Sequence, residues 1–152
     1  IHYKNFHIII EAFNRLGLFL KIIGAGPELE NLKKIAKSNI DFLGFVQNDN
    51  EMRIIYSAAK GFVFANVEDF GLVMAEAQAC GAPVIALAGG GALEIVQSEK
   101  TGVFFNQATI EGLMNAVNKF EKLKFDRQVI SGLMKKFSAD KFKDNLQKHI
   151  EI

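Results

Sequence analysis

One stretch decides how this chain folds: Val67-Glu68-Asp69-Phe70-Gly71-Leu72-Val73-Met74-Ala75-Glu76-Ala77-Gln78-Ala79-Cys80-Gly81. The apolar run 61–65 before it predicts a buried strand. A short polar turn follows, and a helix then begins near Phe70-Gly71 and ends at Gly81, ahead of Pro83. A strand, a turn and a helix start in this order leave backbone N–H groups free to bind an anion.

Two carboxylates flank that anion position. Glu68 lies in the turn, and Glu76 lies about one and a half turns into the helix. Because alanine and valine surround Glu76, we expect its carboxylate to be largely buried, which is costly without a partner. Its two oxygens suit a vicinal diol, which offers two O–H donors side by side. The structural alternative is a glutamate that is favoured by the helix dipole or paired with a lysine.

Composition indicates one globular domain. The chain has 152 residues, is 49% hydrophobic and carries a formal net charge of +1, so neither disorder nor a nucleic-acid partner is indicated. The single cysteine, Cys80, forms no internal disulfide and fits a reducing compartment. No run reaches transmembrane length and none resembles a signal peptide, which predicts a cytoplasmic protein. The chain begins with Ile1 rather than Met, and we expect it to be a fragment.

Apolar runs alternate with helical patterns as far as Asn106, and the chain is helical after that residue. The predicted strands are 19–23, 40–44, 61–65, 83–87 and 101–105. Continuous apolar strands joined by helices predict an α/β fold, a Rossmann-like parallel β-sheet sandwiched by helices. Extra C-terminal helices are predicted at 109–120, at 126–137 and from Ser138 onward. The last is amphipathic and rich in lysine; it packs on its own domain or contacts a membrane surface.

Glycine-bearing turns follow three of these strands, at the edge where open α/β sheets bind ligands. They are Gly24-Ala25-Gly26, Phe70-Gly71-Leu72 and Gly89-Gly90-Gly91. The first lacks the third glycine of a dinucleotide fingerprint, and the chain contains no P-loop motif. No metal-ligand spacing and no glycine-flanked catalytic serine is present either.

Together these residues resemble the nucleotide-sugar-binding, C-terminal half of retaining GT-B glycosyltransferases of group 1 (family 4). Within that group they look most like mannosyltransferases of bacterial polysaccharide assembly. The resemblance extends from Lys4 to about Phe142. It rests on the segments Tyr3-Lys4-Asn5, Ile23-Gly24-Ala25-Gly26-Pro27-Glu28, Phe42-Leu43-Gly44, Glu68-Asp69-Phe70-Gly71-Leu72 with Glu76-Ala77, Cys80-Gly81-Ala82-Pro83-Val84-Ile85-Ala86 and Gly90-Gly91-Ala92-Leu93-Glu94.

The resemblance implies two catalytic residues. Lys4 matches the lysine that contacts the donor diphosphate, where an ammonium group offsets negative charge on the leaving nucleotide. Glu68 matches the acid that lies against hydroxyls of the transferred sugar. A lysine at a helix start is disfavoured by the helix dipole, which supports a functional reading of Lys4.

The resemblance also implies a donor-binding set. Glu76 matches the acid that binds the ribose hydroxyls, as its oxygens already suggested. The other members act through their backbones, with plain turn geometry as the alternative for the glycines. They are Gly24 and Gly26 beside the nucleotide, Phe45 and Val46 beside the base, and Phe70, Gly71 and Leu72 at the sugar hydroxyls and phosphate oxygens.

The function implied by the resemblance is transfer of a hexose, mannose, from GDP-mannose to a saccharide or lipid-linked acceptor at the membrane, without a metal or other cofactor. Residues 1–152 then form one nucleotide-sugar-binding domain that lacks the N-terminal acceptor domain and the first strand, and is inactive alone. Ala65-Asn66 departs from the family, which often has Pro-Ser there. The alternatives are a non-catalytic binding module of the same fold and half of a sugar-nucleotide epimerase.

Overall fold

The computed structural model describes residues 5–137. Its strands all pair in parallel and form two sheets, one of two strands and one of three. The first sheet contains β1 (Leu20–Ile23) and β2 (Ile40–Gly44), and the second contains β3 (Phe62–Phe64), β4 (Val84–Leu87) and β5 (Gly102–Phe105). The bounds of each strand differ from the predicted bounds by at most one residue.

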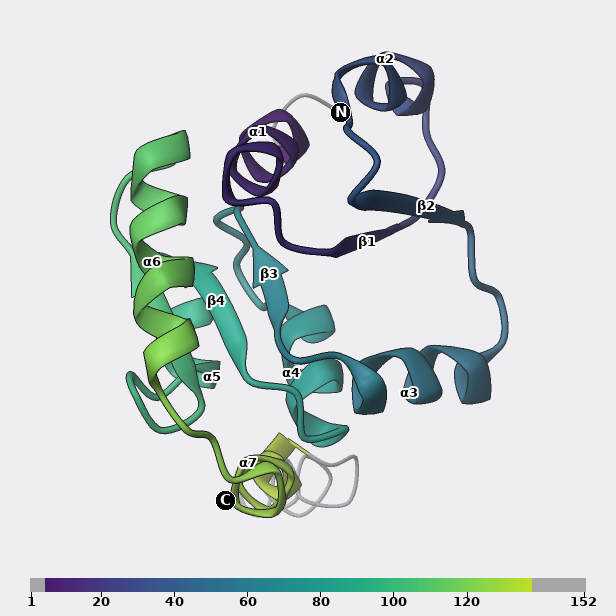
Figure 1. Cartoon of the computed structure of the whole chain (residues 1–152). Coiled ribbons are helices and arrows are strands. Elements are labelled where there is room, and N and C mark those ends of the chain that lie inside the picture. The colour runs from purple at the N-terminus through teal and green to yellow at the C-terminus, as the bar shows by residue number, and fades with distance from the viewer. Residues whose placement is uncertain (1–4, 138–152) are drawn as a thin grey trace.

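Helices connect the strands and follow the last one (Figure 1), and those predicted near 70–81, at 109–120 and at 126–137 are present. The helices are α1 (Phe6–Leu16), α2 (Leu29–Ile35), α3 (Asp49–Ala58), α4 (Leu72–Ala79), α5 (Ala92–Ile95), α6 (Ile110–Lys122) and α7 (Arg127–Leu133), with a 3-10 turn at Met134–Phe137. The side chains of Asn48, Thr109 and Asp126 cap α3, α6 and α7 by accepting backbone N–H bonds. The helix predicted from Ser138 lies outside the described residues.

The strand β4 separates two hydrophobic clusters. Ile85 and Leu87 pack with α1 and α6 on one face, while Val84 and Ala86 pack with α4 and α5 on the other. Side chains of a strand alternate between faces, so a strand buried along its whole length must be covered on both sides. The predicted sandwich is therefore confirmed for the three-stranded sheet.

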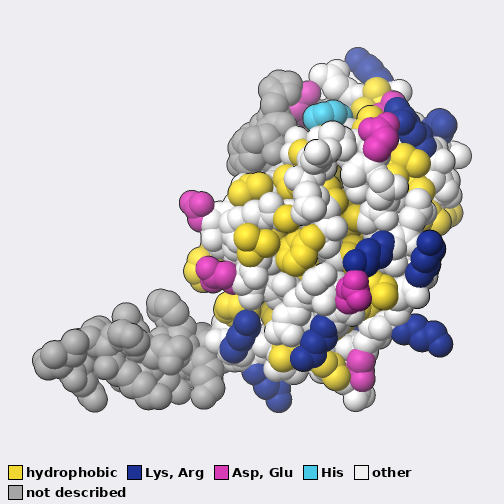
Figure 2. All heavy atoms as spheres, turned by 90° about the vertical axis from the view of Figure 1, so that its left-hand side faces the viewer, with side chains coloured by type: hydrophobic (Ala, Val, Ile, Leu, Met, Phe, Trp, Pro, Cys, Tyr) yellow, Lys and Arg dark blue, Asp and Glu magenta, His cyan; other side chains and the backbone are white. Residues whose placement is uncertain are grey.

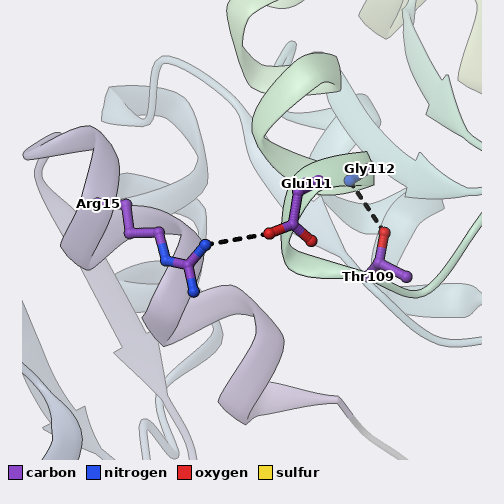
Figure 3. Close-up of polar contacts among 4 residues, drawn as sticks. All are labelled: Arg15, Thr109, Glu111 and Gly112. Atoms are coloured by element: carbon purple, nitrogen blue, oxygen red, sulfur yellow. Dashed lines mark hydrogen bonds and ion pairs between the residues drawn. The ribbon is translucent and has the colours of Figure 1, made fainter.

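The face that carries α1 and α6 is chemically mixed. Figure 2 shows hydrophobic side chains near its centre, with Lys or Arg and Asp or Glu side chains around them. One ion pair on this side joins the two helices: Arg15 Nη1 lies 3.1 Å from Glu111 Oε1 (Figure 3). Both side chains are exposed, so the pair contributes little stability. Apolar packing between α1 and α6 holds this layer together.

The two sheets are not hydrogen-bonded to each other, which the sequence did not predict. Leu20 N donates to Asn39 O, so the backbone groups of Lys21 point away from β2. Phe62 N donates to Pro83 O, so those of Val63 point away from β4. The inner edges of β1 and β3 are therefore unpaired within residues 5–137. The sequence did not predict this division because apolar patterning identifies strands but does not specify which strands pair.

Arg127, the first residue of α7, holds the end of α3. Its guanidinium donates to the carbonyl oxygens of Ala59 (2.8 Å), Ser57 (2.7 Å) and Tyr56 (3.3 Å). The last carbonyls of a helix have no partner within the helix, and a cation there also complements the helix dipole. Arg127 therefore ties α7 to α3.

We expect Arg127→Ala to lower the free energy of unfolding by about 2–3 kcal/mol, because the charge-assisted hydrogen bonds to the carbonyls at the end of α3 are lost. Arg127→Lys keeps the charge but not the planar guanidinium, so its free energy of unfolding should lie between those of the wild type and Arg127→Ala. Urea unfolding followed by circular dichroism measures the change. The matched control is Arg53→Ala, an exposed arginine on α3 that should change stability by less than ~0.5 kcal/mol. Equal effects of the two alanine variants would contradict this role.

Candidate functional site

The turn that carries Glu68 is held by direct backbone contact with the loop after β4. Gly91 N donates to Glu68 O at 2.8 Å. A Cβ atom on Gly90 would overlap Glu68 O, and one on Gly91 would overlap Phe70 O. Glycine is required at both positions because two backbones approach this closely. The half-buried Glu68 side chain forms no hydrogen bond or ion pair within residues 5–137.

The helix α4 begins at this turn with unpaired N–H groups. Met74 N and Ala75 N donate to Gly71 O, at 2.9 and 3.5 Å. Leu72 N and Val73 N precede them and have no intrahelical acceptor. Gly71 is buried, whereas the side chains of Phe70 and Leu72 are 64% and 60% exposed. These amides therefore sit at an open surface, where the helix dipole favours an anion.

Glu76 is exposed, and the prediction that it is buried is wrong. Only one side of α4 is covered by the core: Met74, Ala77 and Gln78 are buried, while Val73 is exposed. The sequence of α4 is apolar on most sides and so does not indicate which side is covered. Within residues 5–137, Glu76 has no ion pair or hydrogen bond, so its carboxylate is available to a ligand.

The buried polar residue of α4 is Gln78, which the sequence reading missed. Its Nε2 donates to Thr101 Oγ1 (3.1 Å) and Thr101 O (3.3 Å), and both side chains are fully buried. Gln78 follows Met74 by four residues, so the two lie on one helix face. That spacing from a core methionine is the signal that could have identified it. Its role is structural, since it fastens α4 to the loop before β5.

A cavity of about 720 Å³ lies where α3, α4 and α7 meet. Residues with polar side chains line it on all three helices: Asp49, Arg53 and Tyr56 on α3, Glu76 and Cys80 at α4, and Arg127 on α7. Burial, with a smaller contribution from negative charge on Glu76 and then Cys80, raises the pKa of Tyr56 to about 12. The Tyr56 hydroxyl is therefore protonated at neutral pH and remains a hydrogen-bond donor near Glu76.

The remaining predicted residues lie at the ends of β1 and β2. Gly24 has a φ of 132°, and this backbone conformation alone requires glycine. Its N–H donates to Gly44 O at 2.7 Å. Gly26 has no positive φ, and a Cβ atom added to it would meet no other atom within 4 Å. Nothing within the described residues requires glycine at 26, which fits close approach by a ligand. Phe45 is 72% exposed and Val46 is half-buried.

The predicted residues thus form two groups, one per sheet. Glu68, Phe70, Gly71 and Leu72 are brought together after β3, with Glu76 farther along α4. The Gly24–Gly26 loop and the Phe45–Val46 backbone follow β1 and β2. Lys4 lies outside the described residues. The next residue, Asn5, contacts the end of β3, where its Nδ2 donates to Ala65 O at 2.7 Å.

The described part of the chain offers neither a metal cluster nor a membrane span. Residues 5–137 contain no group of three His, Cys, Asp or Glu side chains that could hold a metal ion. No helix in this range is long and apolar enough to cross a membrane. The expectations on metal use and on location therefore stay predictions.

Several known proteins with similar sequence or structure are named as glycosyltransferases. The family model described as "Glycosyl transferases group 1" matches residues 1–137. The chain is 36% identical over 114 residues to a GDP-mannose-dependent alpha-(1-6)-phosphatidylinositol monomannoside mannosyltransferase of Mycobacterium tuberculosis, covering 66% of this chain and 29% of that protein. It is 35% identical over 114 residues to the sulfoquinovosyl transferase SQD2 of Arabidopsis thaliana, covering 72% and 22%.

The fold likeness is closer than the sequence likeness. The apo lipopolysaccharide outer core galactosyltransferase WaaB superimposes with a TM-score of 0.84 at 16% identity, covering 97% of this chain and 45% of that one. The chain spans less than a third of the length of the two curated relatives above. Its Rossmann-like α/β fold is confirmed, and so is the resemblance read from the motifs. Since the family model covers most of the chain, this protein belongs to the group 1 glycosyl transferase family.

Proposed function

We propose that this chain is the donor-binding domain of a retaining glycosyltransferase that transfers a hexose, mannose, from GDP-mannose to a saccharide or lipid-linked acceptor. The observation that carries the proposal is the position of the Glu68 turn directly before the start of α4. There a carboxylate without a partner in the described residues stands beside free backbone amides at an open surface. A sugar nucleotide offers hydroxyl donors to the first and phosphate oxygens to the second.

In this proposal the free N–H groups of Leu72 and Val73 bind diphosphate oxygens, and Lys4 supplies the cation. The bond between the anomeric carbon and the diphosphate oxygen breaks first, and positive charge develops on that carbon. The nucleoside diphosphate leaves with the bonding electron pair, and its freed oxygen takes the proton of the acceptor hydroxyl as the acceptor oxygen bonds to the carbon. Groups aimed at the charge that develops contribute most to such a step, because they need no rearrangement. Glu68 holds hydroxyls of the sugar, and the acceptor oxygen bonds to the same face of the ring. No metal or other cofactor is part of the proposal.

Glu76 binds the ribose hydroxyls from the cavity between α3, α4 and α7. Its exposure supports this role, because a free carboxylate accepts both hydroxyls without first breaking an ion pair. The protonated Tyr56 lines the same cavity and can donate to a ribose oxygen. Gly24, Gly26 and the Phe45–Val46 backbone lie beside the nucleotide from the other sheet.

Mannose and the guanine base are proposed from the mannosyltransferase relative, which is named as GDP-mannose-dependent. The sulfoquinovosyl transferase is nearly as similar in sequence and is named for another transferred group, and a solved structure of similar fold, Anabaena HepE, is described in complex with UDP and glucose. These favour a second candidate in which the same site takes a UDP-sugar. The two candidates share the roles of Glu68 and Glu76. They differ in which nucleotide binds more tightly.

We further propose that the acceptor site belongs to a second domain of the same enzyme, peripheral on the inner face of the membrane in the cytoplasm. The unpaired inner edges of β1 and β3 support this proposal, because each edge can still pair with a further strand. One more parallel strand between them, followed by α1, would join the two sheets through a right-handed crossover.

Titration calorimetry with GDP and UDP tests the nucleotide site. We expect the wild-type chain to bind GDP more tightly than UDP, and Glu76→Ala to weaken GDP binding about tenfold because two hydroxyl contacts are lost. The control is Asp41→Ala, which removes an exposed carboxylate on β2 and should change neither affinity. Equal heats for wild type and Glu76→Ala, or none with either nucleotide, would refute the ribose role. Tighter binding of UDP would favour the second candidate.

Glu68 is tested in the complete enzyme by steady-state kinetics with GDP-mannose. We expect Glu68→Ala to lower kcat by about 100-fold or more, because it removes a contact to the sugar as charge develops, while the Kd for GDP changes less than about twofold. Glu68→Gln keeps the size and one acceptor oxygen and should retain more activity than Glu68→Ala. Unchanged turnover in Glu68→Ala would exclude this role.

A further inference from the structure

Tyr56 of α3 is 7% exposed, and its hydroxyl group has no hydrogen-bond partner within the described part of the chain. The backbone oxygen of Tyr56 is satisfied, because it accepts from Ala59 N and from Arg127 Nη2, both at 3.3 Å. A hydroxyl that is buried without a partner costs free energy, since it gives up hydrogen bonds to water on folding. Phenylalanine at this position would avoid that cost, so the presence of the hydroxyl requires an explanation.

The ring of Tyr56 is held in place by apolar contacts. It lies edge-to-face against Phe62 of β3, with the ring centroids 5.6 Å apart and the ring planes at 90°. It also packs in one hydrophobic cluster with Ala77 of α4 and Ala82. Because the ring is packed on apolar groups and Tyr56 lines the cavity between α3, α4 and α7, its polar end faces that cavity. The packed ring therefore holds a hydroxyl ready for a ligand.

Glu76 complements Tyr56 in the same cavity. Its carboxylate only accepts hydrogen bonds, and it has no ion pair or hydrogen bond within residues 5–137. The Tyr56 hydroxyl donates, because burial and then the charge of Glu76 raise its pKa to about 12 and keep it protonated. A hydroxyl on a ligand has one proton to donate and two lone pairs that accept. One ligand hydroxyl can therefore donate to Glu76 and accept from Tyr56 at the same time.

We propose that Tyr56 is a specificity-determining residue, whose hydroxyl donates to one of the two ribose hydroxyls that bind Glu76. The cavity then selects ribonucleotides over deoxyribonucleotides. A nucleotide that lacks this hydroxyl leaves polar groups of the site unpaired, which is how a hydrogen-bonding site rejects such an analogue. This inference rests on the proposed function, because it places the ribose in this cavity.

Titration calorimetry of the chain with GDP, 2′-deoxy-GDP and 3′-deoxy-GDP tests the inference. We expect Tyr56→Phe to weaken GDP binding about fivefold, because one hydrogen bond to the ligand is lost. One deoxy analogue lacks the oxygen that Tyr56 contacts, and the variant should bind that analogue as tightly as the wild type does. The other analogue keeps that oxygen, so Tyr56→Phe should weaken its binding by the same factor as for GDP. Equal losses for all three nucleotides, or a loss for none, would overturn the proposal.

A matched control separates ligand binding from stability. Thr101 is also buried, but its hydroxyl oxygen accepts from Gln78 Nε2 (3.1 Å) and from Gln97 N (2.8 Å). Thr101→Val removes that hydroxyl at similar size and should lower the midpoint of urea unfolding, while the affinities for the three nucleotides stay unchanged. Tyr56→Phe should keep or raise the midpoint, because the hydroxyl that it removes has no partner in residues 5–137. If Tyr56→Phe lowers the midpoint as much as Thr101→Val and leaves the three affinities unchanged, the hydroxyl is structural and the proposal is overturned.

Glu76→Ala distinguishes a failure of this inference from a failure of the proposed function. If it leaves the affinity for GDP unchanged, the ribose does not bind in the cavity, and the roles of Glu76 and Tyr56 fail together. If Glu76→Ala weakens GDP binding and Tyr56→Phe does not, only the role of Tyr56 fails. If UDP binds more tightly than GDP, the same variants are titrated with UDP and its two deoxy analogues. The expected changes are then the same, because both nucleotides contain the ribose.

Discussion

The site depends on one close contact, the approach of the loop after β4 to the turn after β3. Gly91 N donates to Glu68 O, and the two backbones approach so closely that positions 90 and 91 have no room for a Cβ atom. This contact holds the backbone of Glu68 and Phe70 just before the first residue of α4. Because the carboxyl ends of neighbouring parallel strands meet at one edge, a short hydrogen bond between loops suffices to place a carboxylate beside free helix amides.

The two glutamates carry different weight in the functional argument. A buried Glu76 would have required a ligand or a cation to offset its desolvation, and the sequence reading relied on that cost. Glu76 is exposed, so its charge costs little there and its presence alone does not imply a ligand. Its proposed role now rests on its position in a cavity shared with the protonated Tyr56. Glu68 has the stronger case, because it is half-buried within the described residues without a partner and lies beside the open amides of α4.

Local features of the chain could be predicted from the sequence, and features that depend on pairing could not. The helices predicted at 109–120 and 126–137 begin behind the caps Thr109 and Asp126 as expected, since capping depends on a few neighbouring residues. The run 40–44 predicted β2 to the residue. The division into two sheets depends on which edges meet, and periodicity carries no such information. The covered side of α4 was equally hidden, because a helix that is apolar nearly all round has no preferred face. The contact from Asn5 to Ala65 spans 60 residues and leaves no local pattern.

The helix α1 connects the two halves of the site. It packs in one hydrophobic cluster with Ile22 and Ile40 of the first sheet and with Ile85 of the second, although the sheets share no hydrogen bonds. At its start, Asn5 bonds to the end of β3. At its end, Asn14 Nδ2 donates to Ile35 O at 2.7 Å, tying it to the connection between β1 and β2. The loops after β1 and β2 and the turn that carries Glu68 therefore keep their relative positions mainly through α1. A nucleotide that contacts both sets of loops would be bound by two sheets whose relative position is held by one helix.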